Sequence, residues 1–193
     1  MKEFVGAVDE TEDGEYIAFM ICNHESLIKN IPCLPKNFTH LTSVFYSTDR
    51  QQQIINSFDF SQGVLICCIK FGISSLRKEI DNSINFGKMP QVKFRSKISY
   101  RMRKHLNSIC SRFLDKHRIK INEVQFQVDN GDIRGFLMQG GLKCVESSYA
   151  HKIADCIAYA NHRGWPLKGD HIIEKGEDFR LSFRDQIIKD LKL

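Results

Sequence analysis

Residues 3–22 read EFVGAVDETEDGEYIAFMIC, two apolar segments separated by a short acidic one. The β-branched and aromatic residues of the two segments predict strands over 3–9 and 15–22. Residues 11–14 between them end in Asp-Gly, a pair typical of tight turns. The chain is therefore expected to begin with an antiparallel hairpin.

The elements that follow predict an α/β domain. Residues 63–71 are apolar nearly throughout, as in a buried central strand. Apolar residues three and four apart predict helices over 73–84 and about 96–117. Further elements are expected at 123–129 (strand), 132–139 (short helix or loop), 142–146 (strand), 149–162 (helix, capped by Ser147-Ser148 and ended by Gly164) and 182–193 (helix). This order predicts a mixed sheet, antiparallel at its start, with later crossovers through helices.

We expect one domain over residues 1–193. Residues 24–61 form a polar, irregular insertion with a helix from Ser47 to Asn56, and residues from about 164 to 193 form a C-terminal extension.

The composition, 42% hydrophobic and 26% charged, excludes disordered, collagen-like and coiled-coil chains. The sequence shows neither a membrane-spanning apolar run nor a secretion signal, so we expect a cytoplasmic protein without membrane association.

The seven cysteines show no metal-binding or disulfide spacing. Their number is odd, no C-x-x-C occurs, and Cys67 and Cys68 are adjacent within an apolar run. We interpret them as reduced, mostly buried thiols rather than a zinc site, and Cys156 as buried rather than nucleophilic.

A basic stretch without acidic residues lies between Asp81 and Asp115. Such a cluster neutralises phosphates and gains affinity by releasing counterions. The alternative is a solvated helix face, which usually carries both signs of charge. Phe94 and Tyr100 either stack on bases or belong to the core. The residues expected to contact nucleic acid are Lys93, Arg95, Lys97, Arg101, Lys104 and Arg112.

Acidic residues fall where a metal-dependent phosphodiesterase would need them. That chemistry requires carboxylates converging from different elements, because Mg²⁺ and Mn²⁺ prefer oxygen ligands. Asp9 and Glu10 end the first strand, Asp129 ends the strand 123–129, and Asp155 lies in the last predicted core helix. These acids could meet at one edge of the sheet, although strand ends also commonly carry solvated acids.

The helix 149–162 has two faces. Its packing stripe is Ala150, Ile153, Ala154, Ile157 and Ala158, and a separate stripe holds His151, Asp155, Tyr159 and His162. The second stripe is either a surface face with a histidine–aspartate pair or a site in which Asp155 binds metal. In the site interpretation, His151 or His162 handles a proton or contacts the phosphate.

The chain resembles the ribonuclease H-like superfamily from about residue 3 to 163. The resemblance rests on the opening G-A-V-D-E-T, the following antiparallel strand, the acid after the fourth strand, and the late helix H-K-I-A-D-C-I-A-Y-A. It implies a three-layer fold around a mixed five-stranded sheet and nuclease chemistry dependent on Mg²⁺ or Mn²⁺. Carried over by position, Asp9, Asp129 and Asp155 are the metal ligands. The acid that the superfamily carries on its first helix has no clear match here.

Three functions remain open from the sequence. The first is a metal-dependent nuclease, expected to act on single-stranded DNA or RNA, with Asp9, Asp129, Asp155, Glu10 and His151 as catalytic residues. The second is an inactive nucleic-acid-binding module on the same fold. The third is a protein-interaction domain whose basic stretch meets an acidic partner.

Overall fold

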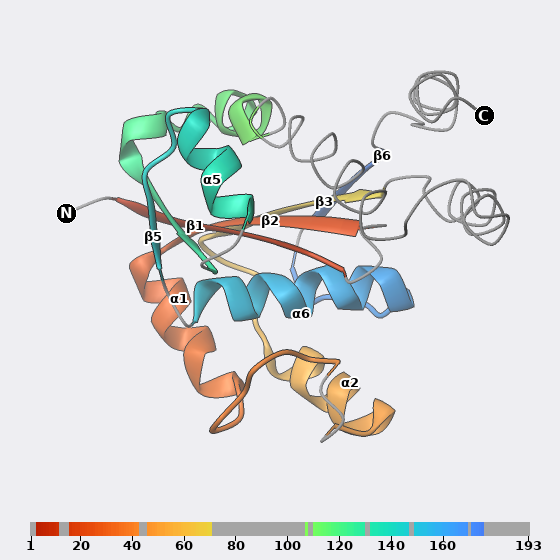
Figure 1. The fold of residues 1–193 in the computed structure, drawn as a ribbon. Helices are drawn as coiled ribbons and strands as arrows, with labels where there is room; N and C mark the ends of the chain where they lie inside the picture. The colour runs from red at the N-terminus through yellow and green to blue at the C-terminus, as the bar shows by residue number, and fades with distance from the viewer. Residues whose placement is uncertain are drawn as a thin grey trace, which may run out of the picture.

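The described part of the chain folds around one mixed six-stranded sheet (Figure 1). The computed structural model describes residues 3–11, 16–42, 46–70, 107, 110–129, 132–146, 149–169 and 171–175. The strand order is β5-β4-β1-β2-β3-β6. The strands are β1 (Phe4–Glu10), β2 (Tyr16–Asn23), β3 (Val64–Lys70), β4 (Val124–Val128), β5 (Cys144–Glu146) and β6 (His171–Lys175).

The directions of the strands confirm the predicted mixed sheet. β1 pairs antiparallel with β2, and β2 pairs antiparallel with β3. β4 is parallel to both β1 and β5, so the chain crosses over between these strands. β6 extends the sheet by pairing parallel to β3. We did not predict this strand, because the two isoleucines of HIIEK are too short a pattern to stand out in a charged segment.

Two apolar clusters cover the two faces of the sheet. Val5 and Ala7 belong to the cluster that includes α6 (Ala150–Arg163), whereas Val8 belongs to the cluster that includes Phe113 and Leu137. This alternation follows the two-residue period of a strand. Figure 1 shows α6 on one side of the sheet and α5 (Asp132–Gln139) on the other. The described elements therefore form three layers, helix on sheet on helix.

Helix α6 confirms its predicted packing stripe. All five residues of the stripe are fully buried, and they are Ala150, Ile153, Ala154, Ile157 and Ala158. The helix ends at Gly164, as predicted, because its left-handed backbone (φ 68°) lets its N–H bond back to Ala160 and Asn161. The N-cap is Tyr149, whose side chain makes no capping bond, and the predicted cap Ser147-Ser148 lies outside the described residues.

The segment 24–61 is more regular than we expected. It contains α1 (His24–Asn30), the 3₁₀ turn η1 (Ile31–Cys33) and α2 (Thr48–Ser57), of which only α2 matches a predicted helix. α1 has only seven residues, and Ile28 is 67% exposed. Its sequence therefore shows no clear apolar stripe from which a helix could be predicted. It begins instead at a local cap, because the side chain of Asn23 accepts a hydrogen bond from Ser26 N at 2.8 Å.

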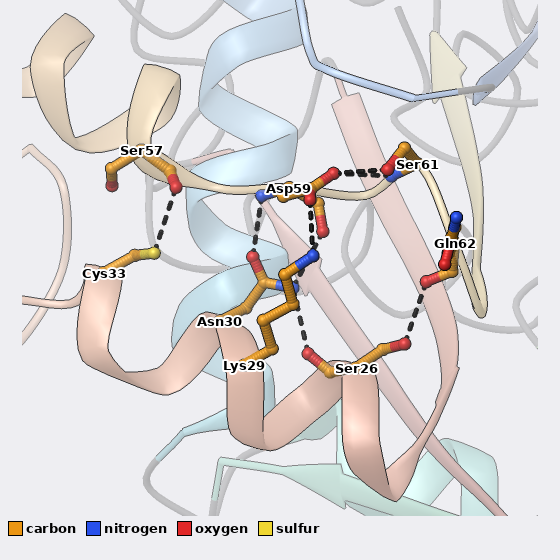
Figure 2. A network of polar contacts seen from close by, with 8 residues as sticks. All are labelled: Ser26, Lys29, Asn30, Cys33, Ser57, Asp59, Ser61 and Gln62. Atoms are coloured by element: carbon orange, nitrogen blue, oxygen red, sulfur yellow. Dashed lines mark hydrogen bonds and ion pairs between the residues drawn. The ribbon is translucent and has the colours of Figure 1, made fainter.

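Figure 2 shows how α1 is tied to the loop between α2 and β3. The Asn30 side chain accepts a hydrogen bond from Asp59 N at 2.8 Å and donates to the carbonyl oxygens of Asp59 (3.0 Å) and Ser26 (2.9 Å). Asn30 is only 2% exposed. By contrast, Lys29 forms an exposed ion pair with Asp59, in which Nζ and Oδ2 are 2.6 Å apart.

We expect Asn30→Ala to lower the free energy of unfolding by about 2–3 kcal/mol, because it removes a buried amide and leaves partly buried backbone groups of Asp59 without partners. The neighbouring Lys29→Ala removes only an exposed ion pair and should lower it less than Asn30→Ala does. Urea denaturation of both variants measures the two values. A larger loss in Lys29→Ala than in Asn30→Ala would show that the surface pair, rather than the buried amide, holds α1.

Several sequence predictions lie outside the described residues. These are the helices over 73–84 and 182–193 and most of the helix over 96–117. The part of the last that is described, residues 110–116, is helical, with Phe113 buried and Arg112 exposed as predicted. Within the part of the chain that the structure describes, no helix is long and apolar enough to cross a membrane.

The cysteines confirm the prediction of reduced, mostly buried thiols. All seven are free, and Cys22, Cys67, Cys68, Cys110 and Cys156 are buried. Cys156 is fully buried in α6, and burial raises the pKa of its thiol well above the ordinary value. It is therefore protonated at neutral pH and is not a nucleophile.

Candidate active site

Three acidic side chains from three elements line one cavity of about 320 Å³. Asp9 lies near the end of β1, Asp129 follows β4 directly, and Asp155 lies in the middle of α6. His151 of α6 lines the same cavity. The four residues are separated by up to 146 positions in the chain, so the fold is what brings them together.

The sheet explains why the two strand-end acids meet. β1 and β4 are parallel neighbours, so their carboxyl ends reach the same edge. Asp9 shares the alternation of Val5 and Ala7, which pack on the α6 side. In β4 the residues of the opposite alternation, such as Phe126, pack on the far side, so Asp129 also falls on the α6 side.

Helix α6 supplies the third acid and two further side chains. His151, Asp155 and Tyr159 are four residues apart, and all three line the cavity. His162, which we placed on the same stripe, is exposed and is absent from the cavity lining. Its ring lies edge-on to Tyr16, with the ring centroids 5.7 Å apart. Of the two histidines that the sequence left open for the proton role, His151 is therefore the one that lines the cavity.

Tyr159 connects the cavity to buried polar groups. Its hydroxyl donates a hydrogen bond to Gln51 Oε1 at 3.2 Å and accepts one from Arg163 Nε at 2.9 Å. Gln51 is buried on α2. Although its place on the helix stripe was predicted, nothing in the sequence showed that Tyr159 links α6 to α2.

The other wall of the cavity comes from the segment 24–61. Thr39, His40 and Thr42 line it, together with Thr11 at the end of β1. Sequence reasoning missed all four residues. The only local signal was the run of hydroxyl and imidazole groups in T-H-L-T, which is not distinguishable from an ordinary polar loop.

One oxygen of Asp155 holds that second wall in place. Asp155 Oδ2 accepts a hydrogen bond from the backbone N–H of Leu41 at 2.8 Å. A carboxylate that accepts a backbone N–H makes a charge-assisted bond, stronger than a neutral one. Asp155 is therefore a structural partner of the segment as well as a member of the acidic group.

The acidic group creates a negative field that reaches the core of α6. The pKa of the Cys156 thiol is raised first by burial and further by the charges of Asp155 and Asp9. Both carboxylates therefore lie close enough to the same buried sulfur to raise its pKa. Three such charges around one cavity favour a cation between them.

The donors match Mg²⁺ or Mn²⁺ in chemistry. Carboxylate oxygens with nearby hydroxyls are the ligands that these hard cations prefer, and Asp9, Asp129 and Asp155 supply them. Among the described residues, no three His, Cys, Asp or Glu side chains are close enough to hold one ion as they stand. The carboxylates would therefore have to draw together around a cation.

Of the remaining predicted site residues, the structure describes the side chain of Arg112 alone. Arg112 is exposed on the helical segment 110–116 and does not line it. The side chain of Glu10 and the residues Lys93, Arg95, Lys97, Arg101 and Lys104 lie outside what the structure describes.

Comparison of the chain with protein-family models, with curated proteins and with solved structures gave no match.

Proposed function

We propose that the protein is a metal-dependent nuclease with a ribonuclease H-like fold. The observation that carries this proposal is the single cavity lined by Asp9, Asp129, Asp155 and His151. The sheet supports it, because three antiparallel strands followed by two parallel ones is the arrangement that the sequence resemblance implies. The substrate would be a phosphodiester of DNA or RNA.

The three aspartates and the histidine have different roles in the proposed chemistry. Asp9, Asp129 and Asp155 would hold the divalent metal, which when bound would activate water and stabilise charge on the phosphate. His151 is suited to hold or move a proton at the cavity wall. Its Nδ1 atom is buried and makes no hydrogen bond within the described part of the chain. Since an unpaired buried nitrogen is unfavourable, a functional partner from substrate or water is the expected reason for it.

The second candidate is a nucleic-acid-binding module without activity. The spacing of the acids favours it, because no three of the described ligand-type side chains converge on one ion. Such a module would need only the basic residues, including the exposed Arg112. It would bind oligonucleotides with a strong dependence on salt and would cleave none.

Cleavage of labelled single- and double-stranded DNA and RNA separates the two candidates. We expect cleavage with Mn²⁺ or Mg²⁺, none with EDTA, and loss of cleavage in Asp9→Asn. Asp115→Asn removes an exposed acid that does not line the cavity and should cleave like wild type. If no condition gives cleavage but salt-sensitive binding remains, the binding module is the better description.

A further inference from the structure

The segment 38–42 forms one wall of the cavity and is anchored in the apolar core. Its first residue, Phe38, is 3% exposed, and Leu41 is fully buried. Thr39, His40 and Thr42, which lie around these two anchors, line the cavity. The two buried side chains hold the backbone of the segment against the core, and this places the neighbouring polar side chains at the cavity.

Hydrogen bonds also hold the backbone of this wall. Leu41 donates its N–H to Asp155 Oδ2 at 2.8 Å, and its carbonyl oxygen accepts from Gln51 Nε2 at 3.1 Å. The carbonyl oxygen of Phe38 accepts from Lys152 Nζ. The wall is thereby connected to both α6 and α2, so the cavity-lining groups are positioned before any ligand arrives.

The two walls of the cavity differ in chemistry. One carries Asp9, Asp129 and Asp155, and the other carries two threonine hydroxyls and the imidazole of His40. A phosphodiester in the cavity is repelled by carboxylates that no cation neutralises, so it needs hydrogen-bond donors from other lining residues. The segment 38–42 offers such donors and is joined to Asp155 through the N–H of Leu41.

His40 is the residue of this wall best suited to meet a phosphate. Its Nδ1 lies 2.9 Å from Thr42 Oγ1, a contact that fixes the orientation of the exposed ring. Nε2 is the other polar atom of the ring, and in the tautomer or protonation state that carries a hydrogen there it donates to an anionic oxygen.

We propose, on the basis of the nuclease function above, that His40 binds a phosphate of the nucleic-acid strand and that the segment 38–42 holds this strand against the carboxylates. His40 is then a substrate-binding residue in the same cavity as the proposed metal-binding acids. The class of ligand is a phosphodiester strand.

The test compares steady-state cleavage by full-length wild type, His40→Ala and His40→Gln. We expect His40→Ala to raise KM about tenfold with a smaller change in kcat, as for loss of one hydrogen bond to a charged group. His40→Gln should recover part of this, because its amide can donate. His24→Ala, which changes an exposed histidine of α1 outside the cavity, should match wild type.

A KM of His40→Ala within twofold of wild type would overturn the inference. If wild type cleaves nothing, the nuclease proposal fails, and the role of His40 is then decided by the anisotropy of a labelled oligonucleotide in EDTA. A tenfold weaker affinity of His40→Ala supports the phosphate contact. Equal affinities, or no binding by wild type, overturn it.

Discussion

Under the proposed nuclease function, an Asp155→Asn variant is expected to cleave nucleic acid about a thousandfold more slowly than wild type, because a carboxylate that binds the metal contributes several kcal/mol to stabilising the transition state. Its stability should change by less than about 1 kcal/mol. The reason is that the amide oxygen of asparagine can still accept the N–H of Leu41, which Asp155 accepts at 2.8 Å. Cleavage rates and urea denaturation measure the two effects.

Asp155→Ala is the matched variant, since it removes both the charge and the acceptor. It should lose cleavage to the same degree and also unfold more easily, by about 1–3 kcal/mol, because the buried N–H of Leu41 is left without a partner. If Asp155→Asn retains wild-type cleavage, Asp155 is only a structural anchor of the segment 38–42, and the set of metal ligands must exclude it.

The sheet and the positions of the acids were predictable because local patterns determine them. The β-branched and aromatic residues of β1 and β2 and the turn residues between them specify the hairpin, and the apolar stripe of α6 specifies which side of the helix packs. Once β4 is parallel to β1, Asp9 and Asp129 must reach the same edge. These features depend on periods of two and 3.6 residues, which a sequence shows directly.

The second wall of the cavity was not predictable in this way. Thr39, His40 and Thr42 reach the site through contacts of Leu41 and Phe38 with residues more than 100 positions away in α6. No periodicity records such a pairing. For the same reason no sequence pattern indicates that Gln51 and Tyr159 are hydrogen-bonded, or that β6 pairs with β3.

Alkaline pH is expected to destabilise the protein strongly, because its buried thiols resist ionisation. Burial raises the pKa of Cys22 to about 12 and, with a smaller effect of Cys67, that of Cys68 to about 12. Burial also raises the pKa of Cys110 and Cys156 well above the ordinary value. In the unfolded chain these thiols ionise near pH 8.5–9.

Above that pH the unfolded chain releases protons that the folded chain retains. The free energy of unfolding is therefore unaffected by the thiols below about pH 8 and falls as the pH rises towards 12. By pH 10 the thiols of Cys22 and Cys68 each lower the free energy of unfolding by about 1.5 kcal/mol, and together by about 3 kcal/mol. Cys110 and Cys156 act in the same direction, and the loss is a large part of the stability of an ordinary domain. Urea denaturation in reducing buffer between pH 7 and 10 measures it through the fluorescence of Trp165, the single tryptophan.

Substitution of one thiol separates proton release from simple loss of packing. Cys22→Ala should begin less stable at pH 7 but lose about 1.5 kcal/mol less than wild type between pH 8 and pH 10. Ile66→Val, in the same apolar cluster, should lower the stability equally at both pH values. A stability of wild type that is flat up to pH 10 would mean that these cysteines reach solvent. The packing of both faces of the sheet, on which the position of the carboxylate cavity depends, would then be looser than the structure describes.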